Sequence, residues 1–74
     1  MENEKSELVA FVKRQRKELK ITQVELSLKA GVGLNFVRDL EQGKSSLRMD
    51  KVNQVLFLFG AALAPVKLQK KEIK

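Results

Sequence analysis

A very short break between two helical segments is the feature that most constrains this chain. Thr22 and Glu25 have the spacing of a capping box, in which each side chain bonds to the other residue's backbone N–H, so a helix is expected to begin at Thr22. Gly31 suits the left-handed position that follows a helix and is expected to end it. A second helix is expected over residues 34–42. Two short helices separated only by residues 31–33 form a helix-turn-helix arrangement.

Two further segments flank this pair and are also expected to be helical. Residues 7–19 carry an apolar stripe and follow Ser6, a residue type suited to the N-cap. Residues 50–59 place apolar side chains at the spacing of a buried helix face. Phe57 falls about 140° around that helix from Val52, so it is expected to lie outside the core. The core-facing residues of the two segments are Leu8, Val12, Leu19, Val52, Val55, Leu56 and Phe59, with Phe11 beside the first stripe.

The tail after the last helix has the alternating pattern of a β-strand. Val66 and Leu68 alternate with polar residues just after Pro65, which predicts a strand over residues 66–69. A lone strand with an apolar face is not stable in water. We therefore expect it to pair antiparallel with the same strand of a second copy, with Phe57 buried in that interface. A disordered tail is the alternative.

The length of the chain allows one domain with a small core. Its 74 residues are divided into a helix-turn-helix domain over residues 1–62 and a dimerisation tail over residues 63–74. Domains of this size often need disulfides, a metal or a partner subunit. The sequence has no cysteine and no histidine, so disulfides are excluded and no metal site is expected. A partner chain is the remaining source of stability, and no cofactor is expected.

The charge of the chain favours an anionic partner. Fifteen basic residues against nine acidic residues give a net charge of +6, which points to nucleic acid first, then an anionic membrane surface, then an acidic protein. RNA is disfavoured because single-strand recognition uses stacking aromatics, and four phenylalanines are the only aromatic residues. The absence of His, Cys and a convincing carboxylate pair leaves no catalytic residues, so an enzyme is not expected. No segment resembles a signal peptide or membrane span, which predicts a cytoplasmic protein of the bacterial nucleoid.

The second short helix, at residues 34–42, carries the side chains expected to read DNA. Val37 and Leu40 form its inner face. The candidate base-reading residues on the opposite face are Leu34, Asn35, Arg38 and Asp39. Arginine pairs with guanine, asparagine with adenine, and aspartate with the amino group of cytosine. An ordinary solvated polar face is the alternative interpretation.

A set of spaced residues across both short helices matches a known pattern. The residues are Thr22-Gln23-Val24-Glu25-Leu26, Ala30-Gly31-Val32, Val37, Leu40-Glu41 and Gly43-Lys44. In these positions the chain resembles the Xre and phage-repressor family of helix-turn-helix domains, over about residues 8–59. The resemblance implies an all-α, four- to five-helix lambda-repressor-like fold, to which this chain adds the short C-terminal strand. It also implies a sequence-specific repressor that binds a palindromic operator as a homodimer.

The same resemblance implies contacts to the DNA backbone. Gln23 starts the first short helix at a position that hydrogen-bonds a phosphate in this family, where the helix dipole also favours an anion. Lys44 occupies a position that resembles that of the family's second phosphate-binding residue. Arg14, Lys17 and Arg48 are further candidates on charge and placement alone.

A structural ion pair is also implied. Arg16 lies on the apolar stripe of the first helix, so it must reach solvent or find an acidic partner. The family pairs an arginine at this position with a glutamate at the end of the reading helix, which here is Glu41. The pair is expected to orient that helix without touching a base.

Two positions depart from the family pattern. Gly33 stands where serine or threonine usually caps the reading helix, which removes a hydroxyl that often reaches phosphate or base. Leu34 fills a position that is commonly polar. Its side chain suits a thymine methyl group but offers no bidentate hydrogen bond.

The predicted tail strand distinguishes two functions. Phage repressors usually carry a fifth helix at this point, whereas HipB antitoxins carry C-terminal strands that pair across a dimer and bind a HipA-type kinase toxin. The chain is therefore expected to be either a repressor acting alone or a HipB-like antitoxin that neutralises a HipA-like toxin and represses its own operon. Both functions need double-stranded DNA and a second copy. The predicted dimer-interface residues are Phe57, Val66 and Leu68.

Overall fold

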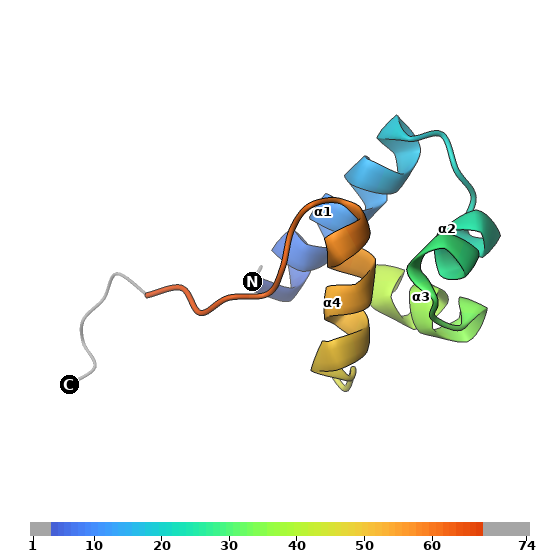
Figure 1. Cartoon of the computed structure of the whole chain (residues 1–74). Helices are drawn as coiled ribbons and strands as arrows, with labels where there is room; N and C mark the ends of the chain where they lie inside the picture. The colour runs from blue at the N-terminus through green and yellow to red at the C-terminus, as the bar shows by residue number, and fades with distance from the viewer. Residues whose placement is uncertain (1–3, 68–74) are drawn as a thin grey trace.

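The computed structural model describes residues 4–67, with side chains described from Glu7 onwards, and shows a small helical domain followed by an extended tail (Figure 1). The helices are α1 (Glu4–Glu18), α2 (Gln23–Ala30), α3 (Leu34–Glu41) and α4 (Met49–Leu58). Residues 4–67 contain no strand. The all-α class predicted from the sequence is therefore confirmed for the described part of the chain.

The first helix begins earlier than its sequence pattern predicts. It starts at Glu4, so Ser6 lies inside the helix and the prediction of Ser6 as N-cap is wrong. A serine inside a helix costs less than about 1 kcal/mol relative to alanine. A residue type suited to capping therefore does not by itself fix where a helix begins. After Glu18 the chain turns at Lys20, whose φ of 60° is left-handed. The turn is closed by N–H donation from Ile21 to the carbonyl of Arg16, at 3.2 Å.

The second helix has the ends that its local sequence predicts. The Thr22 hydroxyl accepts from the N–H of Glu25 at 3.0 Å, and the Glu25 carboxylate accepts from the N–H of Thr22 at 2.8 Å. Gly31 follows in the left-handed conformation at φ 74°. The Gln54 amide of α4 donates to the carbonyls of Ala30 and Gly31, both at 3.2 Å. These bonds attach the end of α2, and with it the following turn, to α4.

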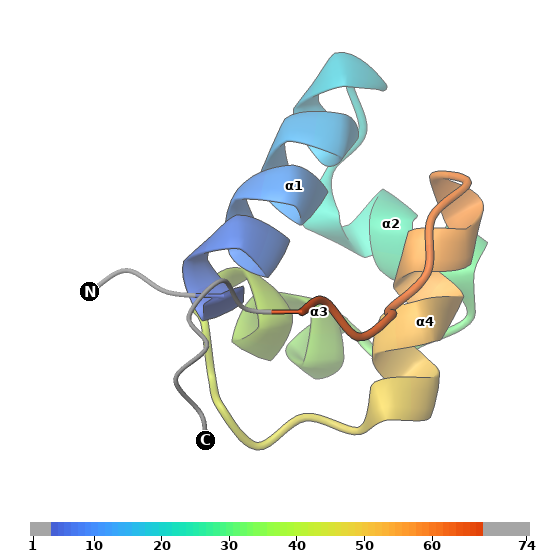
Figure 2. The same ribbon diagram turned by 90° about the vertical axis from the view of Figure 1, so that its left-hand side faces the viewer.

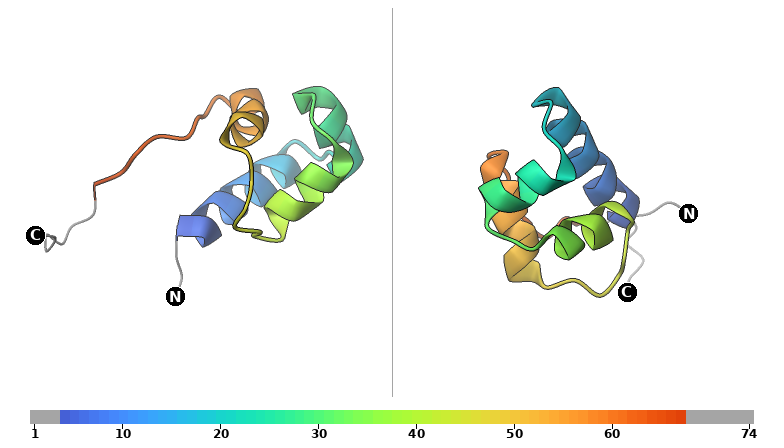
Figure 3. Two further views of the ribbon diagram at one scale, coloured as in Figure 1. Left: turned by 90° about the horizontal axis from the view of Figure 1, so that it is seen from below. Right: turned by 90° about the vertical axis from the view of Figure 1, so that its right-hand side faces the viewer.

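Eight buried aliphatic residues form the core, and every helix contributes to it. They are Val12, Leu26, Val32, Val37, Leu40, Val52, Val55 and Leu56. The helix α2 packs against α3 and α4, while α1 packs beside α3 (Figure 3). Phe11 and Phe59 close one margin of the core with their rings edge to face, 6.3 Å between centroids. Leu19, predicted on the apolar stripe of α1, is instead exposed, because α1 ends one residue before it.

The tail leaves α4 through Gly60, turns back beside that helix (Figure 2) and then extends away from the domain (Figure 1), without forming a strand up to residue 67. The N–H of Leu63 donates to the Asn53 side-chain carbonyl at 2.7 Å, which attaches the start of the tail to α4. The predicted strand is not found at Val66 and residue 67, and its remaining residues, Leu68 and Gln69, lie outside the described residues. A strand needs a neighbouring strand to complete its hydrogen bonds, and residues 4–67 supply none.

Residues 4–67 lack both a membrane-spanning helix and a carboxylate cluster for a metal ion. Among residues 4–67, no helix combines the length and the apolar character needed to cross a membrane. The same residues contain no group of three or more acidic side chains placed to hold a metal ion.

Candidate nucleic-acid interface

The helix α3 presents a buried face and a polar outer face. Val37, Leu40 and Glu41 are buried against the rest of the domain. The predicted base-reading residues lie on the remaining surface: Asn35 and Arg38 are exposed, and Leu34 and Asp39 are partly exposed. Gly33 precedes α3 without a side-chain cap, so the first backbone N–H groups of the helix have no side-chain acceptor from that residue. The outer face therefore offers hydrogen-bonding side chains along a helix of the size that enters a major groove.

Three residues far apart in the sequence hold α3 in place. The Arg16 guanidinium donates to both Glu41 carboxylate oxygens, at 2.7 and 3.1 Å. It also donates to the carbonyl of Ile21 at 3.0 Å. The Gln23 amide donates to the Glu41 carboxylate at 3.1 Å. The end of α1, the start of α2 and the end of α3 are thus joined at one carboxylate.

The pKa of Glu41 reflects this arrangement. The side chain is buried, which disfavours the charged form and raises the pKa. Hydrogen bonds from Arg16 and Gln23 act in the opposite direction, assisted by the positive charges of Arg16 and Lys13. The net result is a pKa for Glu41 below its ordinary value. The carboxylate is therefore ionised and paired at neutral pH.

Gln23, predicted to contact a phosphate, is partly occupied inside the protein. One N–H of its amide is directed to Glu41. A glutamine amide has two N–H groups and one carbonyl, so a second N–H remains beyond this contact. Gln23 is the first residue of α2 and is partly exposed. The position is compatible with a bridge between the Arg16–Glu41 pair and an anion outside the protein.

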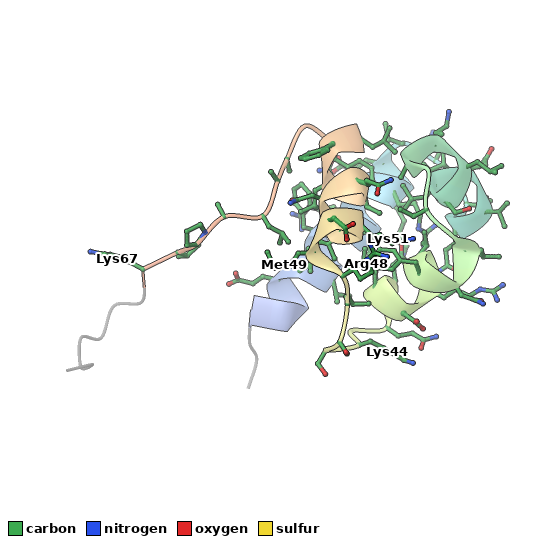
Figure 4. All side chains as sticks on the ribbon, turned by 60° about the horizontal axis from the view of Figure 1, so that its bottom comes forward. Lys44, Arg48, Met49, Lys51 and Lys67 are labelled. Carbon is green, nitrogen blue, oxygen red and sulfur yellow. The ribbon has the colours of Figure 1, made fainter. Side chains whose placement is uncertain are left out.

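Two predicted phosphate ligands have acidic neighbours. The Lys44 ammonium lies 3.7 Å from the carboxylate of Asp39, the predicted base-reading residue on α3. Arg48 donates two hydrogen bonds to Asp50, at 2.8 and 3.1 Å, and these bonds lower the pKa of that exposed carboxyl. Both cations lie in the segment between α3 and α4 (Figure 4). To bind a phosphate, each basic side chain would have to leave its carboxylate partner or contact the carboxylate and the phosphate at the same time.

The basic residues of α1 face different directions. The Arg14 guanidinium lies 5.9 Å from the centre of the Phe11 ring, which packs on Phe59 at the end of α4. Lys17 is exposed. Lys13, which is not among the site residues predicted from the sequence, lies close enough to Glu41 for its charge to lower the pKa of that residue. Its position three residues before Arg16, one helical turn away, is the signal that could have identified it.

Comparison with known proteins identifies the class of this domain. The family model described as "Helix-turn-helix" matches residues 12–60. An uncharacterized HTH-type transcriptional regulator, y4mF of Sinorhizobium fredii (strain NBRC 101917 / NGR234), is 43% identical over 58 residues, which cover 78% of this chain and 76% of the relative. No solved structure matched the chain.

The chain therefore belongs to the helix-turn-helix family, a family of DNA-binding domains. The Xre-type resemblance seen in the sequence is confirmed at this level. Neither the family model nor the relative distinguishes the HipB branch of that family.

Proposed function

We propose that this protein is a transcriptional repressor that inserts α3 into the major groove of a palindromic operator as a homodimer. The observation that carries the proposal is the outer face of α3, where Asn35 and Arg38 are exposed. The opposite face of the same helix is bonded to α1 through the Arg16–Glu41 pair. Membership of the helix-turn-helix family and the regulator name of the relative support the same function. Gln23, Lys17 and Lys44 would position the domain on the backbone, and Arg38 would supply most of the sequence discrimination.

The homodimer is proposed from the apolar surface of α4 and the tail. Phe57 is 62% exposed and Val66 is 80% exposed, and Met49, Leu58 and Leu63 add further exposed apolar area. In Figure 1 the tail lies on the side of the domain away from α2 and α3, so a second copy could bind there without covering the reading helix. Pairing of residues 66–69 of two copies about a twofold axis would give each segment the neighbouring strand that it needs to form a β-strand. The two reading helices would then contact half-sites about 34 Å apart, one DNA turn.

A binding-site selection tests the function directly. Duplexes with a randomised central segment would be incubated with the full chain, and the bound fraction amplified and sequenced over several rounds. We expect an enriched motif with two inverted half-sites whose centres are about 10 base pairs apart. A single unrepeated motif would contradict the dimer, and a lack of any enrichment would contradict sequence-specific binding. A reporter gene placed behind the selected site would then distinguish repression from activation.

A further inference from the structure

The turn between α1 and α2 contains an unusual backbone position. Lys20 has a φ of 60°. The other left-handed residues within residues 4–67 are all glycines, namely Gly31, Gly43 and Gly60. An L-residue with a Cβ is disfavoured in this conformation, and lysine, unlike asparagine or aspartate, has no short polar side chain to compensate locally. The chain thus carries a long cationic side chain where glycine would fit with less strain.

The backbone of this turn is held from both sides. The N–H of Lys20 donates to the carbonyl of Lys17 at 3.0 Å, and the N–H of Ile21 donates to the carbonyl of Arg16 at 3.2 Å. The carbonyl of Ile21 accepts from the Arg16 guanidinium at 3.0 Å, and that guanidinium also binds Glu41, the last residue of α3. The position of Lys20 is therefore tied to the end of α3 through one side chain.

The side chain of Lys20 is exposed and has no acidic partner among residues 7–67. Lys44 and Arg48, by contrast, each lie beside a carboxylate. In Figure 1 the turn between α1 and α2 lies on the same side of the molecule as α2 and α3, away from the tail. Lys20 also lies three residues before Gln23, whose amide reaches the end of α3. The charge of Lys20 is therefore available next to the start of α2.

The dimensions of DNA indicate what lies beside that helix when it is bound. An α-helix with its side chains is about 10–12 Å across, and the major groove is about 12 Å wide. A helix that fills the groove leaves the segments bonded to its ends against the sugar–phosphate rims, and the start of α2 is bonded to the end of α3 through Gln23 and Glu41. We propose that Lys20 is a phosphate-binding residue, held in a strained turn so that its ammonium group meets the DNA backbone next to α2. The proposal rests on α3 being the groove-binding helix.

The test compares Lys20→Asn with wild type on a 30-base-pair duplex of mixed sequence, which requires no knowledge of the operator. Asparagine tolerates the left-handed conformation and removes the charge together with the long aliphatic stem that carries it. We expect roughly three- to tenfold weaker binding at low salt, and a slope of log K against log salt that is smaller by about one unit per chain. Lys20→Arg should retain the wild-type slope. Lys20→Gly should lose the same affinity while its Tm stays unchanged or rises by up to about 5 °C, because the turn relaxes.

Lys29→Gln is the matched control, since it removes the same charge from an exposed residue in the last turn of α2, at the other end of that helix. Its slope should stay at the wild-type value. An unchanged slope for a folded Lys20→Asn variant would overturn the proposal, and so would an equal loss in Lys29→Gln, which would indicate a general effect of net charge. A wild-type chain that does not bind the duplex would refute the DNA-binding function and this inference together, whereas normal wild-type binding with an unaffected Lys20→Asn refutes only the inference.

Discussion

Arg16 and Glu41 are separated by 25 positions in the sequence and meet through two hydrogen bonds of 2.7 and 3.1 Å. Both side chains are largely removed from solvent, with 15% of Arg16 and 3% of Glu41 exposed. A charge that loses its partner in such a place keeps its desolvation cost without the compensating attraction. The pair therefore fixes the position of the end of α3 relative to α1.

Loss of either partner alone should be costly. We expect Arg16→Met and Glu41→Leu each to destabilise the fold by about 3–5 kcal/mol, because each leaves one largely buried charge unpaired. The double variant should be more stable than the sum of the two costs predicts, since it leaves no orphan charge. Denaturant unfolding of the four proteins measures the coupling. Additive costs would show that the two charges do not stabilise each other.

The pair should also make stability depend on pH. The pKa of Glu41 is lower in the folded state than its ordinary value, so the ionised carboxylate adds stability above that ordinary value near 4.5. This contribution should be lost progressively as the pH falls from about 5 through the lowered pKa, because the folded state must then take up a proton at a cost. Thermal unfolding from pH 7 to pH 3 measures the effect. Glu41→Gln should flatten this part of the curve, and a curve identical to wild type would assign the pH dependence to other carboxyl groups.

Arg38 is expected to be the main source of sequence discrimination. Replacing Arg38 with Ala should weaken binding to a selected operator by about 1–3 kcal/mol and binding to random DNA by much less. Arg38→Lys should rescue little of the discrimination, because lysine keeps the charge without the planar pair of donors. Titrations on both DNAs give the ratio. Equal losses on both DNAs would make Arg38 a backbone contact.

The contact between Lys44 and Asp39 predicts opposite effects of two substitutions. Lys44→Ala should weaken binding to operator and random DNA alike and lower the salt slope by about one unit per chain, because a phosphate contact is lost. Asp39→Ala should strengthen binding to random DNA and reduce discrimination, because it removes a carboxylate from the interface and leaves Lys44 unpaired. Salt titrations of both variants test this. If the slope of Lys44→Ala is unchanged, Lys44 does not contact a phosphate.

The dimer proposal predicts that Phe57 and the tail act together. Deleting residues 64–74, or changing Phe57 to Asp, should produce a monomer whose Tm is lower and independent of concentration. Binding to a full operator should weaken far more than binding to a half-site. Leu28→Asp is the matched control, because Leu28 is 77% exposed on α2, outside the proposed interface. Sedimentation of a dimer after the deletion would place the interface elsewhere, and a wild-type chain that is monomeric at tens of micromolar would refute the dimer.

Local sequence was sufficient where a hydrogen bond closes within a few residues. The capping box of Thr22 and Glu25 and the left-handed Gly31 could be predicted because both partners lie within one turn of helix. The buried face of α3 followed from the periodicity of Val37 and Leu40. Two errors occurred at points where local preferences are weak. Ser6 did not mark the start of α1, and Leu19 was assigned to the core although α1 ends at the preceding residue and leaves Leu19 exposed.

The sequence by itself determined the helix-turn-helix class, because its caps, turn and apolar spacing all act over short distances. Only the tertiary structure decided what each charged side chain meets. Packing of three helices brings Gln23 onto Glu41, and the loop after α3 returns Lys44 to Asp39. The left-handed turn at Lys20 could not be predicted either, since its residue type does not favour that conformation. Strand formation in the tail depends on a partner strand, so alternation of Val66 and Leu68 cannot decide it within one chain.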